Sequence, residues 1–229
     1  MVPSTFNSDW LATATGAVLV LACGLSAPAA DTAAARVETN LQALGRVRLD
    51  KEHRAVRFPA AVNQRSGVVE YAVVHTTGKT HESVFRTEAR PQEIHVAMLL
   101  LGVKPANTSS FPADFSTPPP GEPVTLDVSW RGVRGEVRRP LEEFVVATNT
   151  MRSPAAGVWI YNGSWVADGK FAAQREGSII STHVDPDALV NNSWPGREND
   201  DLYQVNTTAL PPDGVPVEVT IRLPPRKPQ

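Results

Sequence analysis

Residues 68–103 read VVEYAVVHTTGKTHESVFRTEARPQEIHVAMLLLGV, and this stretch decides the fold of the chain. Its first half holds two runs rich in β-branched and aromatic residues, 68–75 and 80–86, joined by a short loop that contains Gly78. The pattern predicts two antiparallel strands of a hairpin. Three of the five histidines also lie in this stretch, so we expect any polar site to be built here.

The second half of the stretch predicts one helix at residues 91–101. Pro91 suits the first helical position, where the missing N–H costs nothing, and Glu93 complements the positive end of the helix dipole. Gly102 supplies a C-terminal stop. Apolar residues occupy every side of the segment, including Leu99 and Leu100, so we expect the helix to be buried nearly all round.

Working outward, alternating apolar residues predict further strands near residues 47–49, 56–60, 124–130, 177–183 and 215–223. The first two of these strands are expected to form a hairpin. Between the helix and the third strand, residues 104–123 are rich in proline and small polar residues and predict a long surface loop.

The pair Asn162-Gly163 favours a two-residue hairpin turn, which would pair Tyr161 with Ser164. The predicted fold class is α+β and β-dominated. Its strands are expected to form antiparallel sheets or a partly open sandwich or barrel, with one principal buried helix.

The composition is that of an ordinary soluble domain: 229 residues, 41% of them hydrophobic and 20% charged, with a formal net charge of −2. Phosphate neutralisation requires clustered basic residues, and those of this chain alternate with acidic ones, so we expect no nucleic-acid partner. The nearest approach to a basic patch is a set of four arginines: Arg131, Arg134, Arg138 and Arg139.

The N-terminal segment predicts export. Residues 16–30 read GAVLVLACGLSAPAA, an apolar run of signal-peptide length that ends in small residues. The run 20–23 resembles a lipobox, which would make Cys23 a lipid anchor and the only attachment to a membrane. Against both readings, residues 1–10 lack positive charge and carry Asp9. The expected organisation is a signal or lipoprotein signal at 1–30, a linker at 31–43, one domain at 44–223 and a disordered tail at 224–229.

Six polar residues of the central stretch are candidates for a polar or ligand site: Glu70, Lys79, His81, Glu82, Ser83 and His95. Imidazole and carboxylate ligands suit zinc or non-haem iron, so a divalent metal held by His81, His95 and Glu70 is one hypothesis. Neighbouring residues of a strand point to opposite faces, which separates His81 from Glu82. The alternative hypothesis is a structural network that locks the helix onto the sheet, with no catalytic residue among the six.

The residues of the central stretch resemble the signature of the YdjY-domain family of bacteria. The resemblance rests on the run G-K-x-H-E-S at residues 78–83, followed by I-H-x-A-M-L-L-L-G at residues 94–102. The later runs VWIYNGSW and REGSIISTHVDPDAL are also similar, so the resemblance covers about residues 41–223. It implies an exported protein without a characterised activity.

Some members of that family are labelled ferredoxin-like because of cysteine-rich segments. This chain has a single cysteine, Cys23, which excludes an internal disulfide and an iron–sulfur cluster within one chain. We therefore predict no cofactor.

The expected function is that of an exported, non-enzymatic binding or scaffolding domain of the bacterial envelope, periplasmic or associated with the outer envelope. Its partner would be an envelope protein or a small ligand. The alternative is a metal-dependent enzyme or metal-binding protein that uses the histidine and glutamate cluster.

Overall fold

The computed structural model describes residues 41–157 and 159–225. Four helical segments lie in these ranges: the 3-10 turns η1 (Thr80–Glu82) and η2 (Leu141–Phe144), and the helices α2 (Pro91–Leu100) and α3 (Ala172–Glu176). The strands of the first half are β1 (Leu41–Leu44), β2 (Val47–Asp50), β3 (Ala55–Val62), β4 (Tyr71–His75), β5 (Ser83–Thr87), β6 (Glu122–Gly132) and β7 (Gly135–Pro140). Those of the second half are β8 (Val145–Ala147), β9 (Trp159–Tyr161), β10 (Val166–Ala167), β11 (Lys170–Phe171), β12 (Ser178–Ser181), β13 (Val190–Asn192), β14 (Tyr203–Val205) and β15 (Val217–Arg222).

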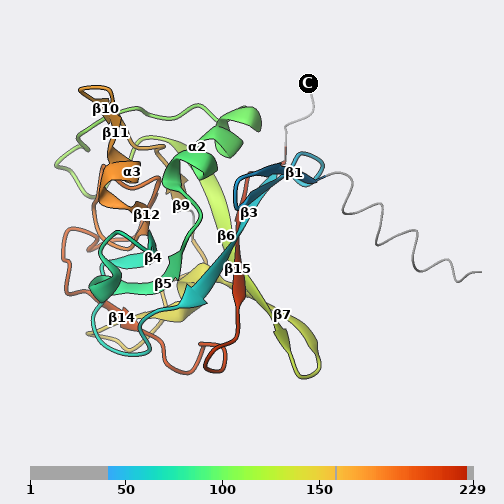
Figure 1. Ribbon diagram of the computed structural model, residues 1–229. Coiled ribbons are helices and arrows are strands. Elements are labelled where there is room, and N and C mark those ends of the chain that lie inside the picture. The colour runs from blue at the N-terminus through green and yellow to red at the C-terminus, as the bar shows by residue number, and fades with distance from the viewer. Residues whose placement is uncertain (1–40, 158, 226–229) are drawn as a thin grey trace, which may run out of the picture.

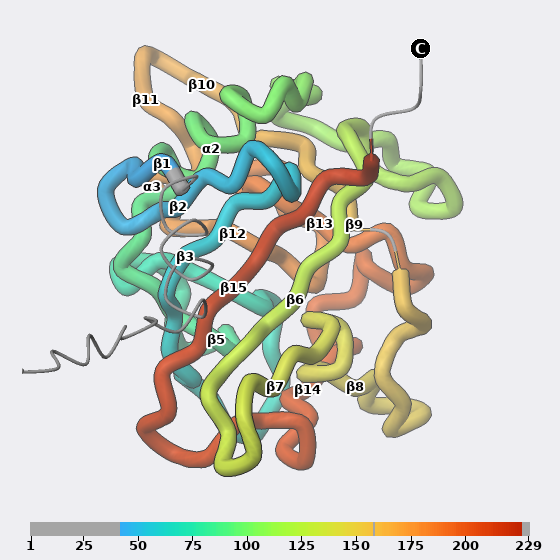
Figure 2. The backbone as a smooth tube through the Cα atoms, turned by 90° about the vertical axis from the view of Figure 1, so that its right-hand side faces the viewer, coloured from blue at the N-terminus to red at the C-terminus, as the bar shows by residue number. Residues whose placement is uncertain are grey.

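Eight of these strands close into a barrel. Each is hydrogen-bonded to the next in the order β3, β15, β6, β9, β13, β12, β4 and β5, and β5 returns to β3. Figure 2 shows β15 and β6 running side by side across the near face. The prediction of a β-dominated fold is therefore confirmed, and among the described residues the sheet closes completely.

The first predicted hairpin is confirmed. Strands β2 and β3 are antiparallel, with Leu49 opposite Val56, and the turn between them contains Arg54. The last predicted strand, β15, pairs with the other edge of β3, where Val219 faces Phe58. These partners are neighbours because their apolar residues alternate in phase and fill the barrel with buried side chains.

The predicted antiparallel hairpin of the central stretch is wrong, because β4 and β5 are parallel, with Tyr71 opposite Ser83. The segment between them includes η1, which carries the chain back so that β5 starts at the same end as β4. The other edge of β5 is taken by β3, and that pairing is antiparallel. Gly78 is needed for close approach rather than for a hairpin turn: a Cβ there would lie 2.9 Å from the carbonyl oxygen of Glu176.

The hairpin predicted at Asn162-Gly163 is also wrong. Strand β9 ends there and pairs with β6 and β13, both of which come from distant parts of the sequence. Asn162 is buried and its side-chain amide donates to the carbonyl oxygen of Ala188 at 3.0 Å. Asn162 therefore holds the end of β9 against the segment before β13 and does not form the turn of a hairpin. The two-residue turn in this region is Asp168-Gly169, between β10 and β11.

Helix α2 matches the predicted helix at both ends. Pro91 is its first residue, the Glu93 carboxylate accepts a hydrogen bond from the backbone N–H of Arg90, and Gly102 follows with φ of +84°. Figure 1 shows α2 beside β3 and β9 at one end of the barrel. Its predicted burial all round is wrong: Ile94 and Met98 are buried, but Leu99 is 42% and Leu100 51% exposed.

The loop predicted at residues 104–123 is irregular up to the start of β6. Arg197, a buried residue, holds it down. Its guanidinium donates to the carbonyl oxygens of Phe115 and Thr117. Within the ranges given above, we find no helix with the length and apolar character that crossing a membrane requires.

Candidate functional site

Four of the six predicted polar residues meet at the end of the barrel where β4 and β5 begin. The Lys79 ammonium lies 3.2 Å from the Glu70 carboxylate and 4.0 Å from that of Glu82. His81 joins them through its Nε2, which lies 2.6 Å from Glu82 Oε1. The predicted separation of His81 from Glu82 is therefore wrong, because residues 80–82 form η1 and not part of a strand. The residues come together because η1 folds residues 80–82 back over the start of β4. We call Glu70, Lys79, His81 and Glu82 the acid cluster.

Two more polar residues reach the acid cluster from the loop after β12. His183 Nε2 lies 3.8 Å from Glu70 Oε2, and the Tyr71 hydroxyl donates to Asp185 at 3.0 Å. His183 and Asp185 are not among the residues that the sequence predicts for this polar site. They lie more than a hundred positions from Glu70, and the run THVD after a predicted strand was the only signal pointing to them.

The charges of the acid cluster compensate one another. Burial acts to raise the pKa of Glu82, but the charges of Lys79 and His81 beside it outweigh that effect, so the pKa lies below its ordinary value. Burial lowers the pKa of Lys79, and its contact with Glu70 outweighs that effect and raises the pKa. Burial and the Asp185 carboxylate together raise the pKa of Tyr71, which keeps its hydroxyl protonated as a donor.

Replacing Glu82 with glutamine is expected to destabilise the protein at neutral pH and to matter less as the pH falls. A carboxyl group whose pKa is lower in the folded state contributes stability above its unfolded pKa, near 4.5, and loses it as the pH falls through the folded value. Urea unfolding of both proteins between about pH 7 and about pH 3 measures this difference. A difference that stays constant over this range would contradict the role of the Glu82 charge.

The remaining two predicted residues lie elsewhere. His95, on α2, places its Nδ1 2.7 Å from the Tyr161 hydroxyl, and its ring lies 4.8 Å from that of Phe171. Burial lowers the pKa of His95, so the neutral imidazole is favoured. Ser83 is buried and donates to the carbonyl oxygen of Phe85 at 3.0 Å. His95 therefore locks α2 onto β9, as the structural alternative expected of a histidine there, but it does so without the acid cluster.

The metal hypothesis named His81, His95 and Glu70. In the described part of the chain, no group of three or more histidine, cysteine, aspartate or glutamate side chains is arranged to hold a metal ion. The carboxylates of Glu70 and Glu82 already share Lys79, and a cation at that position would have to displace the ammonium group. Cys23, the predicted lipid anchor, and the predicted signal segment lie outside the described residues.

A pocket that the sequence did not predict opens on the barrel wall, where β3 changes neighbours from β2 to β5. The N–H of Asn63 donates to the carbonyl oxygen of Val84, in β5. In an antiparallel pair every second residue of a strand hydrogen-bonds to the same neighbouring strand, so the N–H of residue 59 would be expected to face β5 as well. Pro59 lies on the same edge and has no N–H, so the ladder stops before it. The Thr87 hydroxyl donates instead to the Pro59 carbonyl oxygen at 2.5 Å, and the strands diverge beyond.

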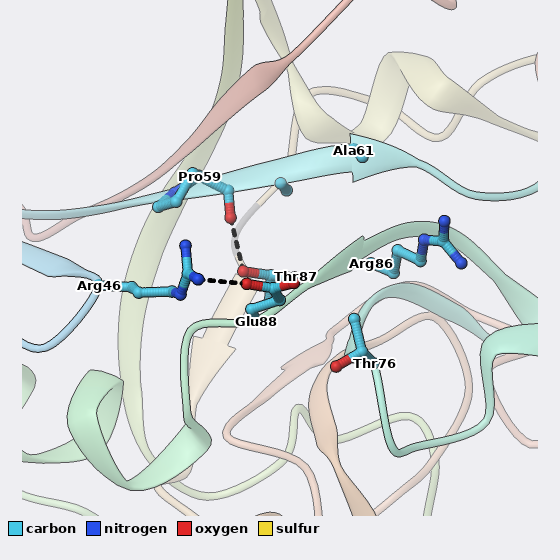
Figure 3. A pocket seen from close by; sticks show the side chains of 8 residues that line it. Arg46, Pro59, Ala61, Thr76, Arg86, Thr87 and Glu88 are labelled. Carbon is cyan, nitrogen blue, oxygen red and sulfur yellow. Dashed lines mark hydrogen bonds and ion pairs between the residues drawn. The ribbon is translucent and has the colours of Figure 1, made fainter. Parts of the chain in front are cut away.

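The pocket has a volume of about 460 Å³, a size that suits a small ligand. It is lined by small apolar, hydroxyl and charged residues: Arg46, Pro59, Ala60, Ala61, Thr76, Arg86, Thr87 and Glu88. Figure 3 shows β3 on one side of the pocket and Arg86, Thr87 and Glu88 of the other wall facing it.

Two arginines give the pocket its electrostatic character. Arg46 pairs with Glu88 at 2.5 Å, with both side chains more than half exposed. The guanidinium of Arg86 has no hydrogen-bond or ion-pair partner among the described residues. An exposed, unpaired guanidinium beside a weakly held one is suited to bind a carboxylate or phosphate group through several N–H donors.

Comparison with known proteins places most of the chain in one family. The family model described as the YdjY domain matches residues 47–222, which take in the strands from β2 to β15 together with the acid cluster and every pocket residue except Arg46. No curated protein and no solved structure matches the chain. Because the family model covers well over half of its length, the chain belongs to the YdjY domain family.

Proposed function

We propose that this chain is an exported, non-enzymatic binding domain of the bacterial envelope, and that the pocket between β3 and β5 binds an anionic ligand. The unpaired guanidinium of Arg86 in a pocket of about 460 Å³ is the observation that carries the proposal. The acid cluster supports it indirectly. Its two carboxylates already share the ammonium group of Lys79, which suits a structural role better than catalysis.

A ligand of this pocket would need an anionic group and a short apolar part. Its carboxylate or phosphate would contact Arg86 and compete with Glu88 for Arg46. Its apolar part would lie over Ala60 and Ala61 on the opposite wall. Exchanging one glutamate for a ligand carboxylate at Arg46 keeps the charge balance, so the binding energy would come mainly from Arg86.

Binding of small anions tests this proposal. Inorganic phosphate and succinate, titrated by calorimetry, are expected to bind, and Arg86→Ala is expected to weaken the binding about tenfold or more, because it removes hydrogen bonds to a charged group. Arg131→Ala is the matched control: it removes one exposed, unpaired arginine far along the sequence and is expected to leave binding unchanged. If neither anion binds, or if both variants weaken binding equally, the pocket proposal is wrong.

Export is a separate part of the proposal and rests on residues 16–30 of the sequence. Mass analysis of the protein purified from its native cells is expected to find a new N-terminus after residue 29 or 30, or a lipid on Cys23. Cytosolic protein that retains Met1 would contradict export without affecting the pocket.

A further inference from the structure

The hairpin of β6 and β7 forms an arm that projects from the barrel. Beyond the region where β6 pairs with β15, the strand continues to Gly132 and returns as β7 through the turn Val133-Arg134. Figure 1 shows the arm standing clear of the other strands, with its tip far from α2. Gly135, with φ of +124°, closes the turn in a backbone conformation that favours glycine.

The tip of the arm combines an exposed apolar side chain with two arginine side chains that form no ion pair with the described residues. Val133 is fully exposed. Arg131 and Arg134, on either side of it, have no ion-pair or hydrogen-bond partner in the part of the chain that the structure describes. Lower on the arm the arginines are paired: Arg138 with Glu136 at 3.6 Å, and Arg139 with a glutamate of η2 at 3.2 Å. Unpaired positive charge is therefore concentrated at the tip.

The two surfaces of the arm suit different partners. The outer edge of β7 has no partner strand among the described residues, which would allow another strand to add there. However, β7 reads GEVRRP, and charged residues and proline on an edge strand are features that prevent such pairing. The tip is convex and has no such protection. Its guanidinium groups match phosphate in shape and charge, and Val133 can enter an apolar layer beneath them.

We propose that the tip of this arm, residues 131–134, binds the surface of a membrane that contains anionic phospholipids. Arg131 and Arg134 would contact lipid phosphates, and Val133 would insert at the level of the headgroups. The proposal depends neither on the pocket nor on a lipid on Cys23, since it rests on the exposure and charge of the tip alone.

Co-sedimentation with vesicles tests the proposal. The protein is expected to bind vesicles of phosphatidylcholine with about one third phosphatidylglycerol, and to bind pure phosphatidylcholine vesicles poorly, at low salt where charges are weakly screened. Each basic residue near an anionic surface contributes about fivefold to binding (about 1 kcal/mol), so Arg131→Ala with Arg134→Ala is expected to weaken partitioning about 25-fold. Val133→Ser is expected to weaken it further.

The chain offers a matched control in Arg138→Ala with Arg139→Ala, which removes the same charge from the same arm at paired positions. This control is expected to keep most of the binding. Equal losses in the two double variants would show that net charge alone is responsible and would overturn the proposal, as would equal binding to both kinds of vesicle or none to either. Self-association that the tip variants abolish, in the absence of vesicle binding, would assign the tip to a second copy of the chain instead.

Discussion

Replacing Phe144 with alanine is expected to lower the free energy of unfolding by about 3–5 kcal/mol. Phe144 ends η2 and is fully buried. Its ring lies edge-on to Phe85 of β5, with centroids 5.1 Å apart, and packs at 6.2 Å against Trp130 of β6. The variant would leave a cavity between two barrel strands that are not neighbours in the sheet, so the surrounding side chains have little freedom to fill it.

Urea unfolding followed by tryptophan fluorescence measures this loss, since Trp130 reports on the environment of the cavity. Phe144→Leu keeps most of the volume and is expected to cost less than about 1.5 kcal/mol. Val133→Ala, at a fully exposed position, is expected to change stability by less than about 0.5 kcal/mol. A loss below about 1 kcal/mol for Phe144→Ala would show that Phe144 does not fill the space between β5 and β6 in the way described.

The parts of the fold that the sequence predicted correctly are those set by neighbouring residues. The β2–β3 hairpin follows from alternating apolar residues on both sides of a short turn, and α2 follows from Pro91 and Gly102 at its ends. The predicted direction of β5 was wrong because β5 also pairs with β3, a strand that lies outside the stretch 68–103 from which the hairpin was predicted. A glycine loop between two strand-like runs favours a hairpin. Here the antiparallel pairing of β5 with the edge of β3 sets the direction of β5 instead.

The candidate sites show the same division. Glu70, Lys79 and Glu82 were predicted together and do meet, because they lie within thirteen positions of one another. His95 was grouped with them because it lies in the same stretch of sequence, whereas the structure pairs it with Tyr161. The pocket could not be predicted, since it depends on a missing N–H at Pro59 and on where β3 leaves β2.

The buried side-chain amides of Asn162 and Asn191, which join the end of β9 to β13, are the basis of the second large prediction. Asn191 of β13 is fully buried and makes three hydrogen bonds: it accepts from the Asp185 N–H at 2.9 Å, and it donates to the Asp185 carbonyl oxygen at 2.8 Å and to the Asn162 side chain at 2.9 Å. Asn191→Leu keeps the volume but leaves the buried Asp185 N–H and the Asn162 side-chain oxygen without partners. The Asp185 carbonyl oxygen still accepts from the Ala188 N–H at 3.1 Å. At about 1–3 kcal/mol for each of these two groups, the expected loss of stability is at least about 2 kcal/mol.

A double-mutant cycle separates this network from simple loss of packing. Asn162 is the side chain that Asn191 contacts, so Asn162→Ala combined with Asn191→Leu is expected to cost less than the sum of the two single changes. Additive costs would contradict the hydrogen-bonded network. Asp185 also receives the Tyr71 hydroxyl, so the network that fixes β13 to β9 holds in place the loop that brings His183 to Glu70. Asn191→Leu is therefore expected to make residues 182–189 more sensitive to protease than Phe144→Ala does at equal global stability, because only the first change releases that loop directly.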